Sequence, residues 1–66
     1  MIVHINGTAT DVEDGARLGE VVDGRVPDRR GVAVALDGEV LPRPTWDETE
    51  LTDGARLEIV GAVQGG

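Results

Sequence analysis

The dipeptide Asn6-Gly7 constrains the fold more than any other feature of the sequence. Both residues tolerate positive φ, which a type I′ turn requires at its two central positions, and such a turn joins two antiparallel strands directly. Residues 1–6 alternate, with the apolar odd-numbered side chains on one face, and residues 8–12 supply the partner strand. The sequence therefore predicts a β-hairpin at the start of the chain.

A short helix is expected after this hairpin. Leu18, Val21 and Val22 stand at positions i, i+3 and i+4, which places them on one apolar stripe. Asp14 is the expected N-cap, and Gly24 is the expected left-handed residue at the C-terminal end. Because so short a helix is marginal alone, it must pack on a sheet.

Three further segments have the composition of strands: residues 32–36, 39–41 and 56–60. Asp37-Gly38 forms a tight turn between the first two, and Asp53-Gly54 is a turn signal before the third. The first segment is apolar on both faces, as expected of a buried strand. Between the last two segments lies a polar connector that contains Trp46. This side chain is expected to plug one end of a small core or to cover a sheet edge, and a docking contact is the lesser alternative.

The element order is hairpin, helix, strand, short strand, loop, strand. The first and last strands cannot form a hairpin because the rest of the chain separates them, so we expect them to pair in parallel through a right-handed crossover. This layout is an α+β β-grasp (ubiquitin-like) fold, a mixed sheet of about five strands with one helix on one face. We predict a domain over residues 1–60 and a flexible tail over residues 61–66.

Composition excludes several classes of function. The chain has 13 acidic and 6 basic residues, a net charge of -7, which argues against nucleic acid and favours a basic partner surface. It has no cysteine, hence no disulfide, thiolate metal site or sulfur nucleophile of its own. All basic residues are Arg, so the chain cannot form isopeptide links to its own lysines. No apolar run is long enough to span a membrane and no signal peptide is evident, so we expect a cytoplasmic protein.

The chain closes with Val63-Gln64-Gly65-Gly66. Glycine is costly to order and has nothing to pack, so such a tail suits insertion into another protein better than packing on its own domain. Without a Cβ on the last two residues, a narrow tunnel can close around the backbone and reach the carboxylate of Gly66. A merely frayed chain end would leave the same residues.

Taken together, these segments resemble the ThiS family, the small ubiquitin-like sulfur carriers of thiamine biosynthesis. The resemblance covers nearly the whole chain and rests on Ile5-Asn6-Gly7, residues 32–40, Pro42-Arg43, Trp46 and residues 53–66. Gly61 departs from the family, which often has Thr or another side chain there, and this affects tail stiffness rather than chemistry.

The resemblance implies that Gly66 carries the chemistry. A ThiF-type adenylyltransferase would use ATP and Mg²⁺ to form the Gly66 acyl-adenylate, and sulfur from a donor such as a cysteine desulfurase would convert it to a thiocarboxylate. Thiazole synthase (ThiG-type) would then accept the sulfur. The chain itself would be a carrier and not an enzyme, with no bound cofactor and no metal.

The resemblance also implies roles for neighbouring residues. Gly65 would give a partner's active site close access to the backbone, and Gln64 and Val63 would make recognition contacts in the tail. Separately, the strand pattern makes Val40, Leu41 and Val60 candidates for a partner-docking patch, although packing in the core would explain them equally well. His4 has no partner residue at the spacing of a catalytic or metal motif.

Other functions fit the same residues. The small subunit of molybdopterin synthase also ends in diglycine on a β-grasp domain, as does a carrier for cysteine synthesis. In a different class, the chain could be a protein modifier joined through Gly66 to lysines of its targets, or a binding module whose tail carries no chemistry.

Overall fold

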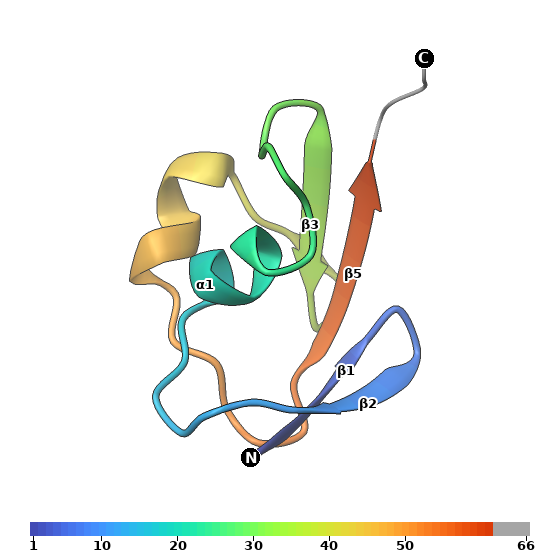
Figure 1. Cartoon of the computed structure of the whole chain (residues 1–66), viewed down its shortest axis with the longest axis vertical. Helices are drawn as coiled ribbons and strands as arrows, with labels where there is room; N and C mark the ends of the chain where they lie inside the picture. The colour runs from blue at the N-terminus through green and yellow to red at the C-terminus, as the bar shows by residue number, and fades with distance from the viewer. Residues whose placement is uncertain (62–66) are drawn as a thin grey trace.

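In the computed structural model, which describes residues 1–61, five strands form one mixed sheet and two short helices pack on one of its faces (Figure 1). The elements in chain order are β1 (Ile2–Ile5), β2 (Thr8–Asp11), α1 (Leu18–Asp23), β3 (Val32–Leu36), β4 (Glu39–Val40), the 3₁₀-helix η1 (Arg43–Glu48) and β5 (Arg56–Gly61). None of the helices within residues 1–61 is both long and apolar enough to cross a membrane.

The sheet has the strand order β2-β1-β5-β3-β4, so the last strand of the chain lies in the middle. β1 and β5 are parallel, with His4 opposite Arg56, and β5 is antiparallel to β3. This confirms the expected β-grasp arrangement. The two hairpins supply the other four strands, and β5 completes the sheet by pairing between them.

Both expected type I′ turns are present. Asn6 and Gly7 have φ values of 50° and 85°, and Asp37 and Gly38 have values of 50° and 88°. These turns connect β1 to β2 and β3 to β4, both antiparallel. The turn residues alone therefore determined the position of each hairpin.

The prediction for the helix ends was wrong. α1 begins at Leu18 after Arg17, whose backbone N–H donates to the Glu20 carboxylate at 2.8 Å, while Asp14 lies outside the helix. Gly24 has a φ of -75°, so it is not left-handed. The chain instead leaves α1 in a right-handed turn, in which the N–H groups of the next two residues both donate to the Val22 carbonyl.

The core lies between the sheet and the helices. Its buried apolar side chains are Val3, Ile5, Leu18, Val22, Val34, Trp46, Leu51, Ala55 and Leu57. Trp46 is the largest of them, and its indole N–H donates to the Leu41 carbonyl at 3.0 Å. Its expected place in the core is confirmed. The 3₁₀-helix η1, where a polar connector was expected, carries this side chain into the core.

An arginine holds the two helices together beside Trp46. The Arg29 guanidinium pairs with Asp23 of α1 at 2.7 Å and with Asp47 of η1 at 2.8 Å, and its centre lies 5.6 Å from the centroid of the Trp46 ring. Hydrogen bonds from Arg29 hold the pKa of both carboxyl groups below the usual range. Arg29 also lies against Gly19, where α1 and η1 approach so closely that a Cβ would collide with the Asp47 carboxylate.

The prediction that β3 is buried on both faces was wrong. Val34 is buried, whereas the neighbouring Ala33 is exposed, because no element covers the second face of the sheet within residues 1–61. The sheet therefore has one covered face and one open face, and the open face is available for contacts with other molecules.

Candidate functional site

The candidate site lies where β5 ends. β5 extends to Gly61, whose partner in the sheet is Val32, one residue beyond the expected end of the domain. The expected reactive residue Gly66 and the expected recognition residues Val63, Gln64 and Gly65 lie outside the described residues. What the structure describes is the strand that leads to them and the surface around that strand.

Side chains from both hairpin turns hold β5 in place. The side-chain amide of Asn6 accepts a hydrogen bond from the Ile59 N–H at 2.8 Å and donates one to the Ile59 carbonyl at 3.1 Å. In the other hairpin, the Asp37 carboxylate accepts from the Arg56 N–H at 3.0 Å. The strand before the tail is thus hydrogen-bonded on both sides, by backbone and by side chains.

Asn6 is a functional residue whose second role the sequence analysis missed. Its place in an Asn-Gly pair indicated only a turn, a role that glycine could also fill. In the folded chain β1 ends at Ile5, and the Asn6 amide continues the pairing with β5 by replacing one backbone N–H and one backbone C=O. A preference for Asn over Gly at this position would have been the available signal.

An apolar patch covers part of the open face beside β5. We call Val40, Val60, Ala33 and Ala35 the valine–alanine patch. Ala33 is opposite Val60, and Ala35 is opposite both Val40 and Glu58, so all four side chains share one face. Val60 is 58% exposed and Val40 is 71% exposed. Such exposure is unusual for large apolar side chains that lie together on one face of a small domain.

The three residues expected to form a docking patch do not share one environment. Val40 and Val60 belong to the valine–alanine patch, at the two ends of a line that crosses β3. Leu41 is half-buried against the core, and its carbonyl accepts the hydrogen bond from Trp46. The structure therefore brings two of the three residues to one surface and assigns Leu41 to packing.

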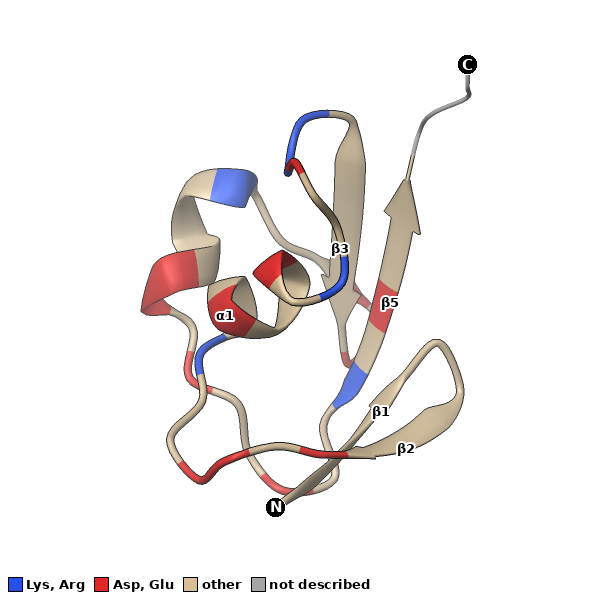
Figure 2. Cartoon of the chain, viewed as in Figure 1, with Lys and Arg blue, Asp and Glu red and all other residues tan. Residues whose placement is uncertain are grey.

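Charged side chains lie on the same face as the patch. Glu58 is exposed and lies on β5, two residues before Val60 and across Ala35 from Val40. Arg56 follows toward the other end of β5 (Figure 2). The carboxylate of Asp53, a second exposed acidic residue, accepts a hydrogen bond from the Ile2 N–H at 2.8 Å. Glu58 is thus the better placed of the two for contact with a partner.

The described residues do not form a metal centre. Within residues 1–61 there is no group of three or more His, Cys, Asp or Glu side chains arranged to hold a metal ion. His4 lies on the open face opposite Arg56, in a position that a second cation makes unfavourable for binding a metal.

Comparison with known proteins identifies the relationship. The family model described as "ThiS family" matches residues 3–66, which includes the closing diglycine. The chain belongs to the ThiS family. None of the curated protein sequences matches it.

Two solved structures agree with this ThiS-family assignment. A crystal structure of the thiamine biosynthesis protein ThiS from Geobacter metallireducens has a TM-score of 0.83 and 30% sequence identity, with both chains covered completely. A solution structure of a thiamine biosynthesis protein from the same organism has a TM-score of 0.81 at 30% identity, covering 100% of this chain and 88% of the other. The similarity extends over the whole ThiS-type domain, so the expected fold class is confirmed.

Proposed function

We propose that this chain is a sulfur carrier of thiamine biosynthesis that carries sulfur as a thiocarboxylate on Gly66. The observation that carries the proposal is the family match, which runs through residues 65–66 and so includes the diglycine itself. The thiamine biosynthesis proteins of similar structure support the same pathway. The chain acts as a cosubstrate of other enzymes rather than as an enzyme.

The chemistry of a carboxylate explains why an activating partner is needed. A terminal carboxyl group has a pKa of about 3.5, so it is an anion at neutral pH and resists attack by a nucleophile. A ThiF-type adenylyltransferase joins this oxygen to the α-phosphorus of ATP with the help of Mg²⁺, and pyrophosphate leaves. The outer sulfur of a persulfide, supplied from cysteine through a donor such as a cysteine desulfurase, then displaces AMP and forms an acyl disulfide. A thiol reductant cleaves the S–S bond of this acyl disulfide, is itself oxidised to a disulfide with the donor, and leaves the thiocarboxylate on Gly66. Thiazole synthase of the ThiG type receives the sulfur from the resulting thiocarboxylate.

The described residues contribute a rigid base and a contact surface to this scheme. β5 is fixed in the middle of the sheet by backbone pairing and by the Asn6 and Asp37 side chains, so the residues after Gly61 start from a defined position. The valine–alanine patch lies directly beside this strand and is the docking surface for the activating enzyme. Glu58 beside this patch pairs with a cation of that partner, and the overall charge of -7 speeds their encounter.

One mass measurement tests the chemistry. The protein is incubated with its adenylyltransferase, ATP, Mg²⁺ and a sulfur source, and the intact mass is then determined. We expect a gain of ~16 Da on the C-terminal fragment, because sulfur replaces one oxygen. If the adenylyltransferase is active on another ThiS-family carrier, an unchanged mass of this chain would contradict the proposal. Adducts on target lysines would indicate a protein modifier instead.

A truncation separates the role of the tail from that of the domain. A variant that lacks Gly65 and Gly66 is expected to keep the thermal midpoint of the full chain and to release no pyrophosphate in the adenylation assay. To identify the pathway, a strain without the gene is grown with and without added thiazole. A growth requirement for thiazole supports the proposal, whereas loss of molybdoenzyme activity would assign the chain to molybdopterin synthesis.

A further inference from the structure

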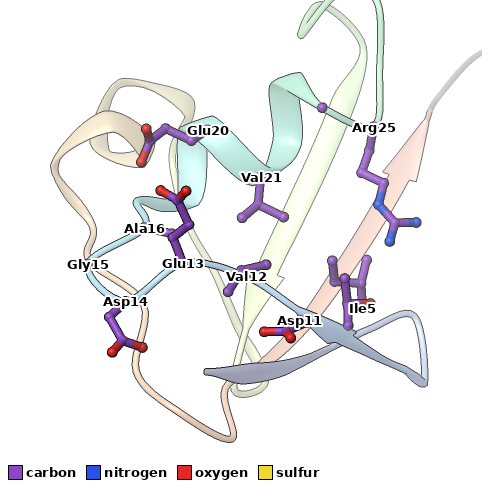
Figure 3. Close-up of a pocket in the computed structure, with 12 residues that line it drawn as sticks. Ile5, Asp11, Val12, Glu13, Asp14, Gly15, Ala16, Glu20, Val21 and Arg25 are labelled. Atoms are coloured by element: carbon purple, nitrogen blue, oxygen red, sulfur yellow. The ribbon is translucent and has the colours of Figure 1, made fainter.

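A groove separates α1 from the first hairpin, on the covered side of the sheet and away from the valine–alanine patch. It has a volume of about 800 Å³ and opens to solvent. The half-buried Val12 and Val21 line its centre together with the buried Ile5, which lies on the side of Arg25 (Figure 3). The groove is therefore a concave surface with an apolar centre, which no element described within residues 1–61 fills.

The two ends of the groove carry opposite charge. Glu13, Asp14 and Glu20 lie at one end and Arg25 at the other, with Asp11 on the rim between them (Figure 3). Within residues 1–61, no arginine forms a salt bridge with any of the four carboxylates; Asp11 and Asp14 lie near the Met1 nitrogen at 3.7 and 3.2 Å. A ligand with cations at the acidic end and an apolar centre would complement this distribution.

One wall of the groove is a free sheet edge. Among residues 1–61, β2 pairs only with β1, and Met1 and Val12 exchange two hydrogen bonds of 2.8 and 2.9 Å. In an antiparallel pair, residues with such exchanges alternate with residues whose N–H and C=O groups point away from the partner strand. Ala9 and Asp11 occupy these outward positions, and they direct their backbone groups to the open side of β2.

The hydrogen bonds of β1 confirm which residues of the hairpin point their backbone groups away from the partner strand. His4 is opposite Ala9, and its N–H donates to the Ala55 carbonyl at 2.8 Å, away from β2. Ile2 is opposite Asp11, and its N–H donates to the Asp53 carboxylate. The outward groups of Ala9 and Asp11 therefore offer two donors and two acceptors to a further strand.

We propose that this groove is a second binding surface, which takes an extended basic segment of a partner protein as an added strand on β2. The segment forms backbone hydrogen bonds with Ala9 and Asp11 and places an apolar side chain over Val12 and Val21. Its Lys or Arg residues lie beside Glu13 and Asp14. This mode of recognition combines main-chain bonds for affinity with alternate side-chain contacts for specificity.

Charge favours such a partner over a second copy of this chain. Pairing of two β2 edges would bring two acidic rims together, on molecules that each carry a net charge of -7. Like charges at a shared edge oppose that association, whereas a basic segment gains from the same field. Because β1 separates β2 from β5, the groove can be occupied while the open face beside β5 is bound to another protein.

Synthetic peptides test the proposal on the full chain. The probes are the acetylated, amidated peptides RKVTVTV and VTVTVKR, which place their cations at the acidic end in antiparallel and parallel addition respectively. We expect one of them to shift the backbone amide resonances of Ala9, Asp11, Val12 and Val21 in a saturable manner, more weakly as salt is raised. Peptides with Glu in place of the cations should not bind. RKVPVPV should not bind either, because Pro removes the N–H groups that face Ala9 and Asp11 in antiparallel addition.

Matched variants assign the binding to the groove. Asp11→Asn with Glu13→Gln should weaken binding about fivefold at low salt, since each exposed charge pair contributes modestly. Glu39→Gln with Glu48→Gln removes the same charge from β4 and η1 and should leave binding unchanged. Absence of saturable shifts with both basic peptides, or equal loss in the two double variants, would overturn the proposal. Concentration-dependent shifts at the same amides without peptide would replace the basic partner with a second copy.

Discussion

The two faces of the sheet consist of side chains from the same strands, but one face packs against the helices and the other faces solvent. On the covered face, Val34 and Leu57 are almost completely buried beneath the helices. On the open face, Ala33, which precedes Val34 in the chain, and Val60, three residues after Leu57, face solvent. The difference follows from the alternation of side chains along a strand, which sends successive residues to opposite sides.

This comparison separates stability from recognition. A residue on the covered face is fixed by packing, so its substitution changes the free energy of unfolding. A residue on the open face has few internal contacts, so its substitution changes binding to other proteins and leaves folding intact. Adjacent positions on one strand can therefore be used to test the two properties independently.

The largest effect is expected from Leu57→Ala. Removing most of this buried side chain leaves a cavity in the core, and such changes cost about 2–5 kcal/mol. Val60→Ala on the open face should change the free energy of unfolding by less than about 0.5 kcal/mol. Urea denaturation followed by Trp46 fluorescence measures both values, and equal losses in the two variants would contradict the assignment of faces.

A second prediction concerns the contact between the two helices on the covered face. Gly19→Ala forces the Asp47 carboxylate and Arg29 to move, and overpacking of this kind costs about 1–3 kcal/mol. Gly24→Ala is the matched control, because φ is negative there and the nearest atom to an added Cβ is 3.6 Å away. Thermal denaturation should show a lower midpoint for the first variant and an unchanged or higher midpoint for the second.

A third prediction concerns the side chains of the two hairpin turns that hold β5 in place. Asn6→Gly retains a residue that tolerates positive φ but loses both hydrogen bonds to Ile59, so we expect a loss of about 1–2 kcal/mol. Asp37→Gly loses one such bond, to Arg56, and should cost less. Hydrogen exchange of the Ile59 amide should accelerate in the Asn6 variant beyond the change in global stability. Exchange that follows global stability alone would show that the contact with Asn6 is not a local restraint.

A fourth prediction is a pH dependence that originates beside α1. Hydrogen bonds from Arg29 lower the pKa of Asp23 and of Asp47 in the folded chain below the ordinary 3.8. The stabilising contribution is therefore complete above pH values near that ordinary pKa, and it is lost as pH falls through the lower folded pKa. We expect Arg29→Met to reduce the slope of stability against pH in the acid range. An identical slope in the variant would show that other carboxyl groups account for the acid sensitivity.

The smallest effect on stability and the clearest effect on recognition are expected from Val60→Asp. The thermal midpoint should stay within a few degrees of the original, since the side chain is exposed. If the valine–alanine patch meets the activating enzyme, kcat/KM for adenylation should fall about tenfold or more, as for a central interface residue. Ile2→Asp is the control, because Ile2 is an exposed apolar residue on the same face but lies on β1, away from the patch. Equal losses in the two variants would point to net charge rather than to the patch.

Local signals in the sequence were enough for most of the fold. The pairs Asn6-Gly7 and Asp37-Gly38 predicted both hairpin turns, since few residue types accept their backbone angles. The alternation of residues 56–60 predicted β5, and the elements between β1 and β5 required parallel pairing. These features depend on backbone geometry and on periodicity, which a sequence displays directly.

Features that depend on distant contacts were not predictable in the same way. Asp14 and Gly24 have the residue types of helix caps, but α1 begins and ends elsewhere because Arg17, Glu20 and the carbonyl of Val22 satisfy its ends. The Arg29 cluster joins residues from three separate segments. Leu41 looked equally suited to a surface or a core, and only the position of Trp46 decided between them.

The sequence by itself determined the turns, the strands, the absence of any cysteine chemistry, and the diglycine to which the proposed reaction belongs. The tertiary structure decided which apolar residues remain exposed, because that depends on which face of the sheet the helices cover. It also decided that Asn6 and Asp37 hold β5 with their side chains, and that an acidic groove lies beside a free sheet edge. Each of these features requires contacts between residues that are far apart in the sequence, and no local pattern specifies such contacts.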